Sequence, residues 1–130
     1  MKHIALLAAA AALFAGTASA DPVFGTWQTN KDDNGNYGHI KVAQCGGAIC
    51  GTLVKSFDSA GQPLDTENVG RQLIWDMKNE GGGEYAGGKL YSPDRDKTYN
   101  GRLVLSGGSL DVKGCVLGVC LSGGKWARVN

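Results

Sequence analysis

The sequence lacks an excess of charge of either sign. Its 130 residues carry 13 Lys and Arg against 12 Asp and Glu, which gives a formal net charge of +1 without any basic run. Nucleic-acid-binding domains concentrate Lys and Arg on one face or in one segment, so this class of function is disfavoured. The chain is not depleted of hydrophobic residues either, because these make up 42% of it. A disordered chain is therefore excluded.

Catalytic and metal-binding motifs are missing as well. The sequence contains no Gly-x-Ser-x-Gly elbow, no phosphate-binding P-loop, no Gly-x-Gly-x-x-Gly and no His-Glu-x-x-His. His39 is the only histidine beyond residue 20, and without an obvious base partner it is interpreted as a surface residue. Asp94 and Asp96 offer too few oxygens for a calcium loop and are interpreted as a polar hairpin tip. We predict no catalytic residue, no metal site and no cofactor.

Only one long hydrophobic run is present, and it lies at the start of the chain. Lys2 and His3 precede an apolar stretch over residues 4–14, and Ala18-Ser19-Ala20 fits the small-x-small cleavage rule. The run is about a dozen residues, whereas a membrane span needs about 20. The pattern predicts a cleaved signal peptide over residues 1–20 and a single mature domain over residues 21–130, without a membrane span and located in the periplasm or secreted.

The four cysteines form two equally spaced pairs, each with four residues between its members. Export into an oxidising compartment favours disulfides. We predict the local pairings Cys45–Cys50 and Cys115–Cys120, because each pair flanks a possible hairpin tip and opposed strand residues lie within disulfide reach. Pairings between the two clusters would close longer loops and stay open at this stage. Zinc is disfavoured by the shortage of histidine and by the spacing.

Glycine is abundant, with 21 residues where average usage of about 7% predicts fewer than half as many. Gly-rich and Asn/Asp-rich turns separate short segments with period-two alternation, which is typical of antiparallel β-structure. The expected strands cover residues 24–29, 37–44, 49–56, 72–78, 84–91, 98–106, 109–115 and 125–129. Eight such strands predict an all-β up-and-down barrel, because closure removes exposed edges; a two-sheet β-sandwich is the alternative. Residues 58–71 are expected to form a loop across one barrel end.

The alternation also predicts an interior, which an eight-stranded barrel fills with its own side chains or shares with one small ligand. Aromatic residues with hydroxyl groups, together with a thioether, suit a pocket for an apolar body with a polar handle. The candidate ligand-binding residues are Tyr37, Trp75, Met77, Tyr85, Tyr91 and Tyr99.

One apolar loop tip stands out, because hairpin tips are usually polar. Residues 116–119 read Val-Leu-Gly-Val between two cysteines. Leu117 and Val119 are therefore candidates for contact with a partner or for folding over the barrel mouth. Packing of Leu117 against a neighbouring loop is the alternative.

Several motifs resemble known families. Gly25-Thr26-Trp27 is similar to the Gly-x-Trp signature of lipocalins, in which the tryptophan packs beneath a basic residue of the last strand; Arg128, two residues after Trp126, matches that position. Such a stack contributes about 0.5–2 kcal/mol. With Cys45-x4-Cys50-Gly51, the run Ile-Trp-Asp-Met-Lys at 74–78, the run from Gly87 to Tyr99, Gly114-Cys115-x4-Cys120 and the C-terminal Trp-Ala-Arg-Val, the chain resembles the domain-of-unknown-function 2147 family of small exported bacterial proteins.

This resemblance implies a lipocalin-like barrel and no settled activity. The leading hypothesis is a non-enzymatic exported module that binds a small apolar or amphipathic ligand inside the barrel. The alternative is a periplasmic protein-interaction or inhibitor module that acts through loops at the barrel end. An envelope enzyme that uses His39 is a third and weaker hypothesis.

Overall fold

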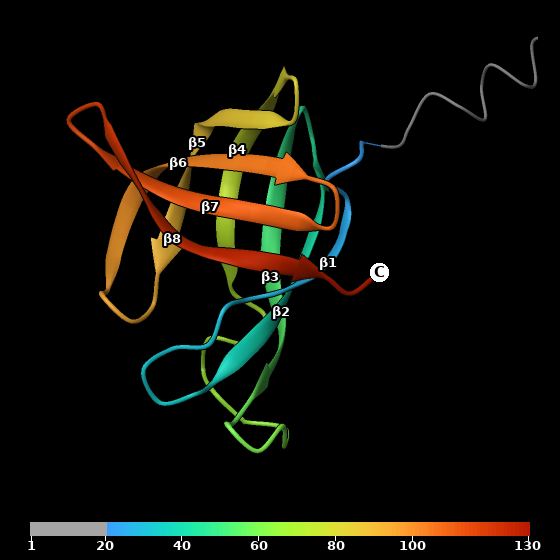
Figure 1. Cartoon of the computed structure of the whole chain (residues 1–130), viewed down its shortest axis with the longest axis vertical. Coiled ribbons are helices and arrows are strands. Elements are labelled where there is room, and N and C mark those ends of the chain that lie inside the picture. The colour runs from blue at the N-terminus through green and yellow to red at the C-terminus, as the bar shows by residue number, and fades with distance from the viewer. Residues whose placement is uncertain (1–20) are drawn as a thin grey trace, which may run out of the picture.

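The protein was analysed as a computed structural model that describes residues 21–130; the predicted signal peptide lies outside the described residues. Eight strands follow one another along the chain: β1 (Gly25–Gln28), β2 (Tyr37–Cys45), β3 (Ala48–Phe57), β4 (Gln72–Gly81), β5 (Glu84–Ser92), β6 (Lys97–Ser106), β7 (Ser109–Val116) and β8 (Val119–Arg128). Each strand pairs with the next, and β8 closes onto β1 (Figure 1). The predicted all-β up-and-down barrel is therefore confirmed, and the sandwich alternative is wrong.

The described residues contain no helix with the length and apolar character required to span a membrane. The loop over residues 58–71 lies at one end of the barrel together with the loop over residues 29–36 (Figure 1).

The last strand starts earlier than the sequence predicted, at Val119 and not at Lys125. The predicted boundary is wrong because Gly123 and Gly124, which directly precede the expected strand over residues 125–129, lie inside β8 and not in a turn. Val112 pairs with Gly124 and Lys113 with Ser122, so Gly123 is an extra residue inside the strand. It forms a bulge, a feature for which glycine is suited.

Both predicted local disulfides are present. Cys45 is bonded to Cys50 at the β2–β3 turn, and Cys115 is bonded to Cys120 at the β7–β8 turn. Cys45 lies on β2 and Cys50 on β3, while the second bond joins directly opposed residues of β7 and β8. Each disulfide therefore fixes one hairpin tip.

An irregularity in β4 changes which of its residues face inward. Ile49 pairs with Met77 and Gly51 with Ile74, so that two steps along β3 correspond to three steps along β4. Asp76 accommodates the mismatch with a positive φ of 57°. As a result Ile74 and Met77 are both buried although they are three residues apart.

A matching irregularity lies in β5. Tyr85 pairs with Leu103 and Gly88 with Gly101, which again sets three steps against two, and Gly87 between them has a φ of 83°. Because β4 and β5 each carry an extra residue, the two strands remain in register with each other. Tyr85 is thereby directed into the interior, where it is fully buried.

One end of the barrel is packed solid. The buried side chains there come from the N-terminal segment and from the seven strands β1 to β7, and they are Val23, Trp27, Val42, Ile49, Met77, Tyr85, Leu103 and Leu110. Trp27 is completely buried and donates from Nε1 to the carbonyl oxygen of Val23 at 2.9 Å. The guanidinium of Arg128 lies 4.3 Å from the Trp27 ring. We refer to this region as the closed end.

Candidate functional site

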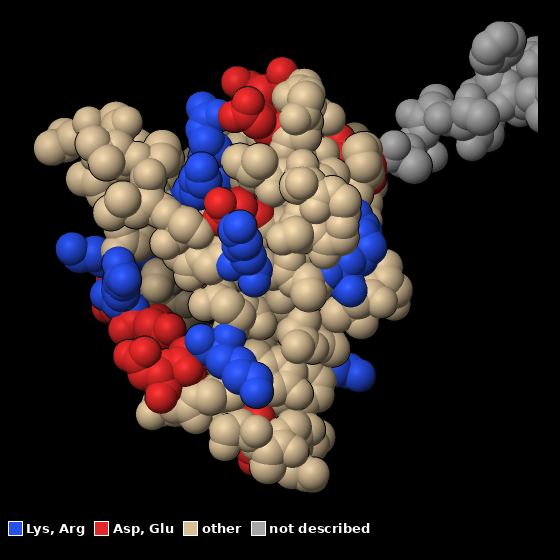
Figure 2. All heavy atoms as spheres, in the orientation of Figure 1, with Lys and Arg blue, Asp and Glu red and all other residues tan. Residues whose placement is uncertain are grey.

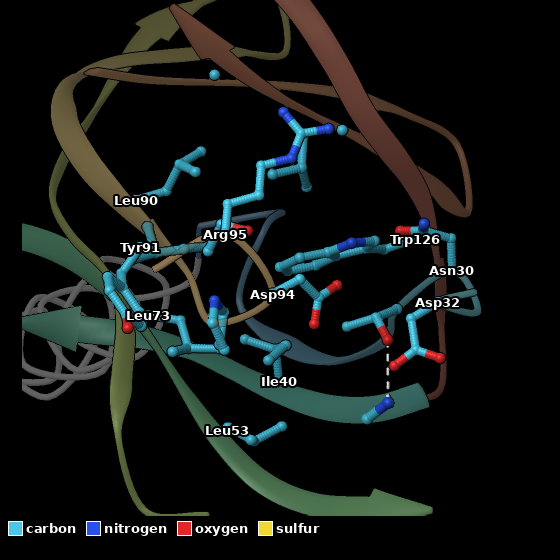
Figure 3. A pocket seen from close by; sticks show the side chains of 18 of the residues that line it. Asn30, Asp32, Ile40, Leu53, Leu73, Leu90, Tyr91, Asp94, Arg95 and Trp126 are labelled. Atoms are coloured by element: carbon cyan, nitrogen blue, oxygen red, sulfur yellow. Dashed lines mark hydrogen bonds between the residues drawn. The ribbon is translucent and has the colours of Figure 1, made fainter. Parts of the chain in front are cut away.

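The half of the barrel away from the closed end is hollow. A cavity of about 730 Å³ lies there (Figure 3), a size within the range of about 300–1,000 Å³ that is typical of small-molecule sites. Ile40 and Leu53 form part of one wall, and Trp126 projects from β8 opposite them. The other aliphatic and aromatic strand residues that line it are Tyr37, Leu73, Ile74, Leu90, Tyr91, Tyr99, Val112, Val116, Val119 and Leu121.

Polar groups gather around the cavity on the loops that border it. Asn30 and Asp32 come from the loop after β1, and Asp94 and Arg95 come from the loop between β5 and β6 (Figure 3). Asp32 Oδ1 accepts hydrogen bonds from the backbone N–H groups of Asn34 and Asn36, both at 2.9 Å, and thus braces its own loop. Apolar walls with a polar border match the two parts of an amphipathic molecule.

The barrel wall is incomplete beside this cavity. β1 has only four residues and pairs with β8 only through Trp27↔Arg128 and Gln28↔Ala127. The first half of β8 therefore has a strand neighbour on one side only. Val119 and Leu121 in this half both line the cavity and are more than half exposed. The cavity thus has an apolar edge that faces solvent.

Three of the six predicted ligand residues lie at the cavity, namely Tyr37, Tyr91 and Tyr99. The Tyr37 ring stacks on Phe57 with centroids 5.1 Å apart. The Tyr91 hydroxyl donates to Asp96 Oδ1 at 2.5 Å. This hydrogen bond raises the pKa of Tyr91, and burial adds to the effect.

The Arg71 guanidinium lies 3.9 Å from the centre of the Tyr91 ring. A cation over an aromatic face restrains both groups. Tyr91 is therefore held from two sides, by Asp96 at its hydroxyl and by Arg71 at its ring.

The other three predicted residues do not reach the cavity, and the prediction that all six form one pocket is corrected. Met77 and Tyr85 are fully buried at the closed end. Trp75 belongs neither to the core nor to the cavity, and it pairs with exposed Lys89 on the outer surface. For Trp75 the cause is the extra residue in β4, which breaks the alternation that the prediction assumed. Met77 and Tyr85 do face inward, but they lie at the closed end and not beside the cavity.

Sequence reasoning missed Trp126 and Ile74 as cavity residues. For Trp126 a signal was available, because it lies two residues before Arg128 and residues two apart share one face of a strand. For Ile74 none was available, since its inward position depends on the irregular pairing of β4.

Tyr85 is held at the closed end by the first described residue. Its hydroxyl donates to Asp21 Oδ1 at 2.6 Å. The Val23 N–H donates to the same oxygen, and the Asn79 amide donates to Oδ2. Burial by itself would raise the pKa of Asp21, but these three hydrogen bonds outweigh it and lower the pKa below its usual value. Burial, with the Asp21 hydrogen bond and charge, raises the pKa of Tyr85.

We expect the Asp21–Tyr85 contact to make stability pH-dependent at both extremes. Asp21 makes its full contribution to the free energy of unfolding above about pH 4, and this contribution is lost as the pH falls through its lowered pKa in the folded state. The contribution of Tyr85 is complete below about pH 10 and declines above it, because the unfolded tyrosine ionises first. Tyr85→Phe should lower the free energy of unfolding by about 1 kcal/mol at neutral pH. In urea unfolding at different pH values, it should also reduce the decline of this free energy above about pH 10. If the free energy of unfolding of Tyr85→Phe declines with alkaline pH as steeply as that of the original protein, this expectation is contradicted.

His39 lies away from the cavity, on the barrel wall near Gln28. Its Nε2 is 3.2 Å from Gln28 Oε1, and its ring centre is 4.8 Å from that of Phe57. Burial, and then the charge of Lys55, lowers the pKa of His39. Among residues 21–130 no group of three or more His, Cys, Asp or Glu side chains is placed to hold a metal ion.

A closed antiparallel barrel with one sealed end and one hollow end defines the class of lipocalin-like barrels. The structure is similar to that of a protein from the human pathogen Helicobacter pylori that is described as belonging to the lipocalin family, with a TM-score of 0.66, 17% identity and coverage of 85% of each chain. The chain belongs to the family described as "Uncharacterized protein conserved in bacteria (DUF2147)", whose family model matches residues 25–128. A comparison with curated proteins gives no match.

Proposed function

We propose that the protein is an exported, non-enzymatic binding protein that holds one small apolar or amphipathic ligand in the cavity at the open end of its barrel. The observation that carries the proposal is the division of the interior into two halves. One half is tightly packed and stabilises the fold, while the other leaves about 730 Å³ behind apolar walls. An unfilled apolar space of this size costs packing energy, which is expected where a ligand provides the missing contacts.

The border of the cavity favours an amphipathic ligand over a pure hydrocarbon. Arg95 lines the cavity, and within the described chain it has no carboxylate within 4.0 Å. Together with the neighbouring amide and hydroxyl groups it offers donors for a polar head group. The apolar tail would then lie between Leu53, Leu90 and Trp126.

Two further observations support export and the lack of catalysis. The two disulfides suit an oxidising compartment outside the cytoplasm. His39, the residue on which the enzyme hypothesis rests, does not line the cavity and contacts Gln28 and Phe57.

The three tryptophans provide a direct test. Trp27 is fully buried at the closed end, Trp75 lies on the outer surface and Trp126 lines the cavity. We expect ω-bromododecanoate, an amphipathic probe whose bromine quenches indole on contact, to quench the fluorescence in a saturable way. Trp126→Phe should remove the quenching, whereas the matched variant Trp75→Phe should retain it.

Saturable quenching that survives Trp126→Phe but is lost in Trp75→Phe would place the probe on the outer surface and refute the cavity site. An absence of quenching up to the solubility limit of the probe would count against a fatty-acid-like ligand in this cavity.

A further inference from the structure

The tip of the β7–β8 hairpin is apolar and exposed. Leu117 is 97% exposed, and Val116, Val119 and Leu121 are each more than half exposed. We call these four residues the apolar tip. The hairpin projects beyond the barrel (Figure 1), and on the face that Figure 2 shows, its projecting end carries no Lys, Arg, Asp or Glu. Four exposed aliphatic side chains on one hairpin end form an apolar patch of the kind that marks a protein or membrane interaction site.

The backbone of this turn makes the choice of residue more unusual. Leu117 and Gly118 have φ values of 53° and 82°, and a two-residue hairpin turn with positive φ at both positions strongly prefers Asn-Gly. Leucine is disfavoured there because its Cβ crowds the backbone. Leu117 is thus both strained and exposed, while the Cys115–Cys120 disulfide at its base holds the turn in place. Turn formation alone does not account for leucine at this position.

The chemistry of the tip favours a lipid surface over a protein partner. Protein interfaces depend on Trp, Tyr and Arg, whereas the exposed tip side chains are all aliphatic. No acidic residue occurs between Val112 and Gly124. Lys113 pairs with Ser122, so this basic residue lies one residue pair further from the turn than Leu121. At about 3.3 Å per residue, the distance from the turn to Leu121 is close to 10 Å. This matches the depth of about 5–10 Å to which interfacial elements enter a bilayer.

The apolar tip is also continuous with the cavity. Val116, Val119 and Leu121 belong to both surfaces. A lipid surface that received the tip would therefore lie against the incomplete part of the barrel wall. A ligand with an apolar tail could then pass between the membrane and the cavity without crossing water.

From these observations we infer that the protein docks peripherally on lipid bilayers, with the apolar tip inserted and the cavity edge facing the membrane. Basic and acidic groups nearly balance in the sequence, and Asp94 and Asp96 lie on the loop after β5. Electrostatic attraction to anionic lipids therefore contributes little to docking. The insertion of the apolar tip provides the driving force. Zwitterionic membranes should therefore suffice, and high salt should not release the protein. Docking does not depend on the proposed ligand, because vesicle binding is measured with the cavity empty.

Co-flotation with phosphatidylcholine vesicles tests the inference. The full mature chain should float with the vesicles, equally at low and high salt. Leu117→Asn should reduce the partition coefficient at least tenfold, and the fold should persist because asparagine suits the positive φ of this turn. Val54→Asn, which changes an exposed valine on β3 far from the tip, should float like the original protein.

A second variant measures how deeply the apolar tip enters the bilayer. Leu117→Trp should be quenched by lipids brominated on their acyl chains, whereas the original protein should be quenched weakly. If the original protein fails to float at millimolar lipid, if Leu117→Asn floats unchanged, or if high salt abolishes binding, the inference is overturned. Self-association or capture of a protein through the tip without flotation would also overturn it. Quenching of Trp126 by ω-bromododecanoate in Leu117→Asn tests the ligand cavity separately, so that the two proposals can fail independently.

Discussion

Replacing Trp27 by alanine should lower the free energy of unfolding by about 3–5 kcal/mol, the range measured for large buried aromatic residues. Trp27 has no exposed surface and fills the closed end of the barrel. Its loss would also leave the Val23 carbonyl without its indole donor and Arg128 without the ring over which it stacks. Because domains of this size have about 5–15 kcal/mol of stability in total, the variant should be marginally folded.

Urea unfolding followed by circular dichroism measures this effect, and Trp75→Ala is the matched control. Trp75 is half-buried on the outer surface, so its replacement should cost about 1 kcal/mol. Equal losses for the two variants would contradict the assignment of Trp27 as the residue that closes the barrel.

Replacing Leu90 by tryptophan should fill the cavity. We expect the affinity for ω-bromododecanoate to fall at least tenfold, which corresponds to about 1.4 kcal/mol. Leu90 is half-buried and directed into the hollow half of the barrel (Figure 3). A larger side chain there enters empty space, so the free energy of unfolding should change little. Both quantities can be measured on one preparation by fluorescence titration and urea unfolding.

The same substitution in the packed half of the barrel, Leu103→Trp, is the control for Leu90→Trp. Leu103 is fully buried beside Tyr85 and Met77 at the closed end, so Leu103→Trp should be overpacked and lose about 1–3 kcal/mol or more. An equal destabilisation by Leu90→Trp would show that the open half has no room for a ligand. Unchanged probe affinity in a stable Leu90→Trp would show that the probe binds elsewhere.

Much of the architecture could be predicted from local chemistry. Period-two alternation and Gly-rich turns locate seven of the eight strands closely, because each turn is specified by the residues within it. The disulfides Cys45–Cys50 and Cys115–Cys120 follow the same local logic, and both are present. The arrangement of Arg128 above Trp27 required a resemblance, since the two residues are far apart in sequence and meet only when the barrel closes.

The cavity could be predicted only in part, because inward positions depend on pairing irregularities that are set by neighbouring strands. Strict alternation placed Trp75 inside and did not identify Ile74 as an inward residue. The extra residue in β4 exchanges these roles. Alternation also says nothing about where along the barrel a side chain lies. Tyr85 was therefore grouped with Tyr99, although one fills the closed end and the other lines the cavity.

The central claim is that the open half of the barrel holds a small molecule with an apolar tail. Intermolecular nuclear Overhauser effects between unlabelled dodecanoate and the isotope-labelled methyl groups of the protein test it most directly. We expect cross-peaks from the acyl chain to methyl groups of Ile40, Leu53 and Leu90, and none to those of Leu103 and Leu110 at the closed end. Cross-peaks confined to exposed methyl groups that do not line the cavity, such as those of Leu117, would contradict it.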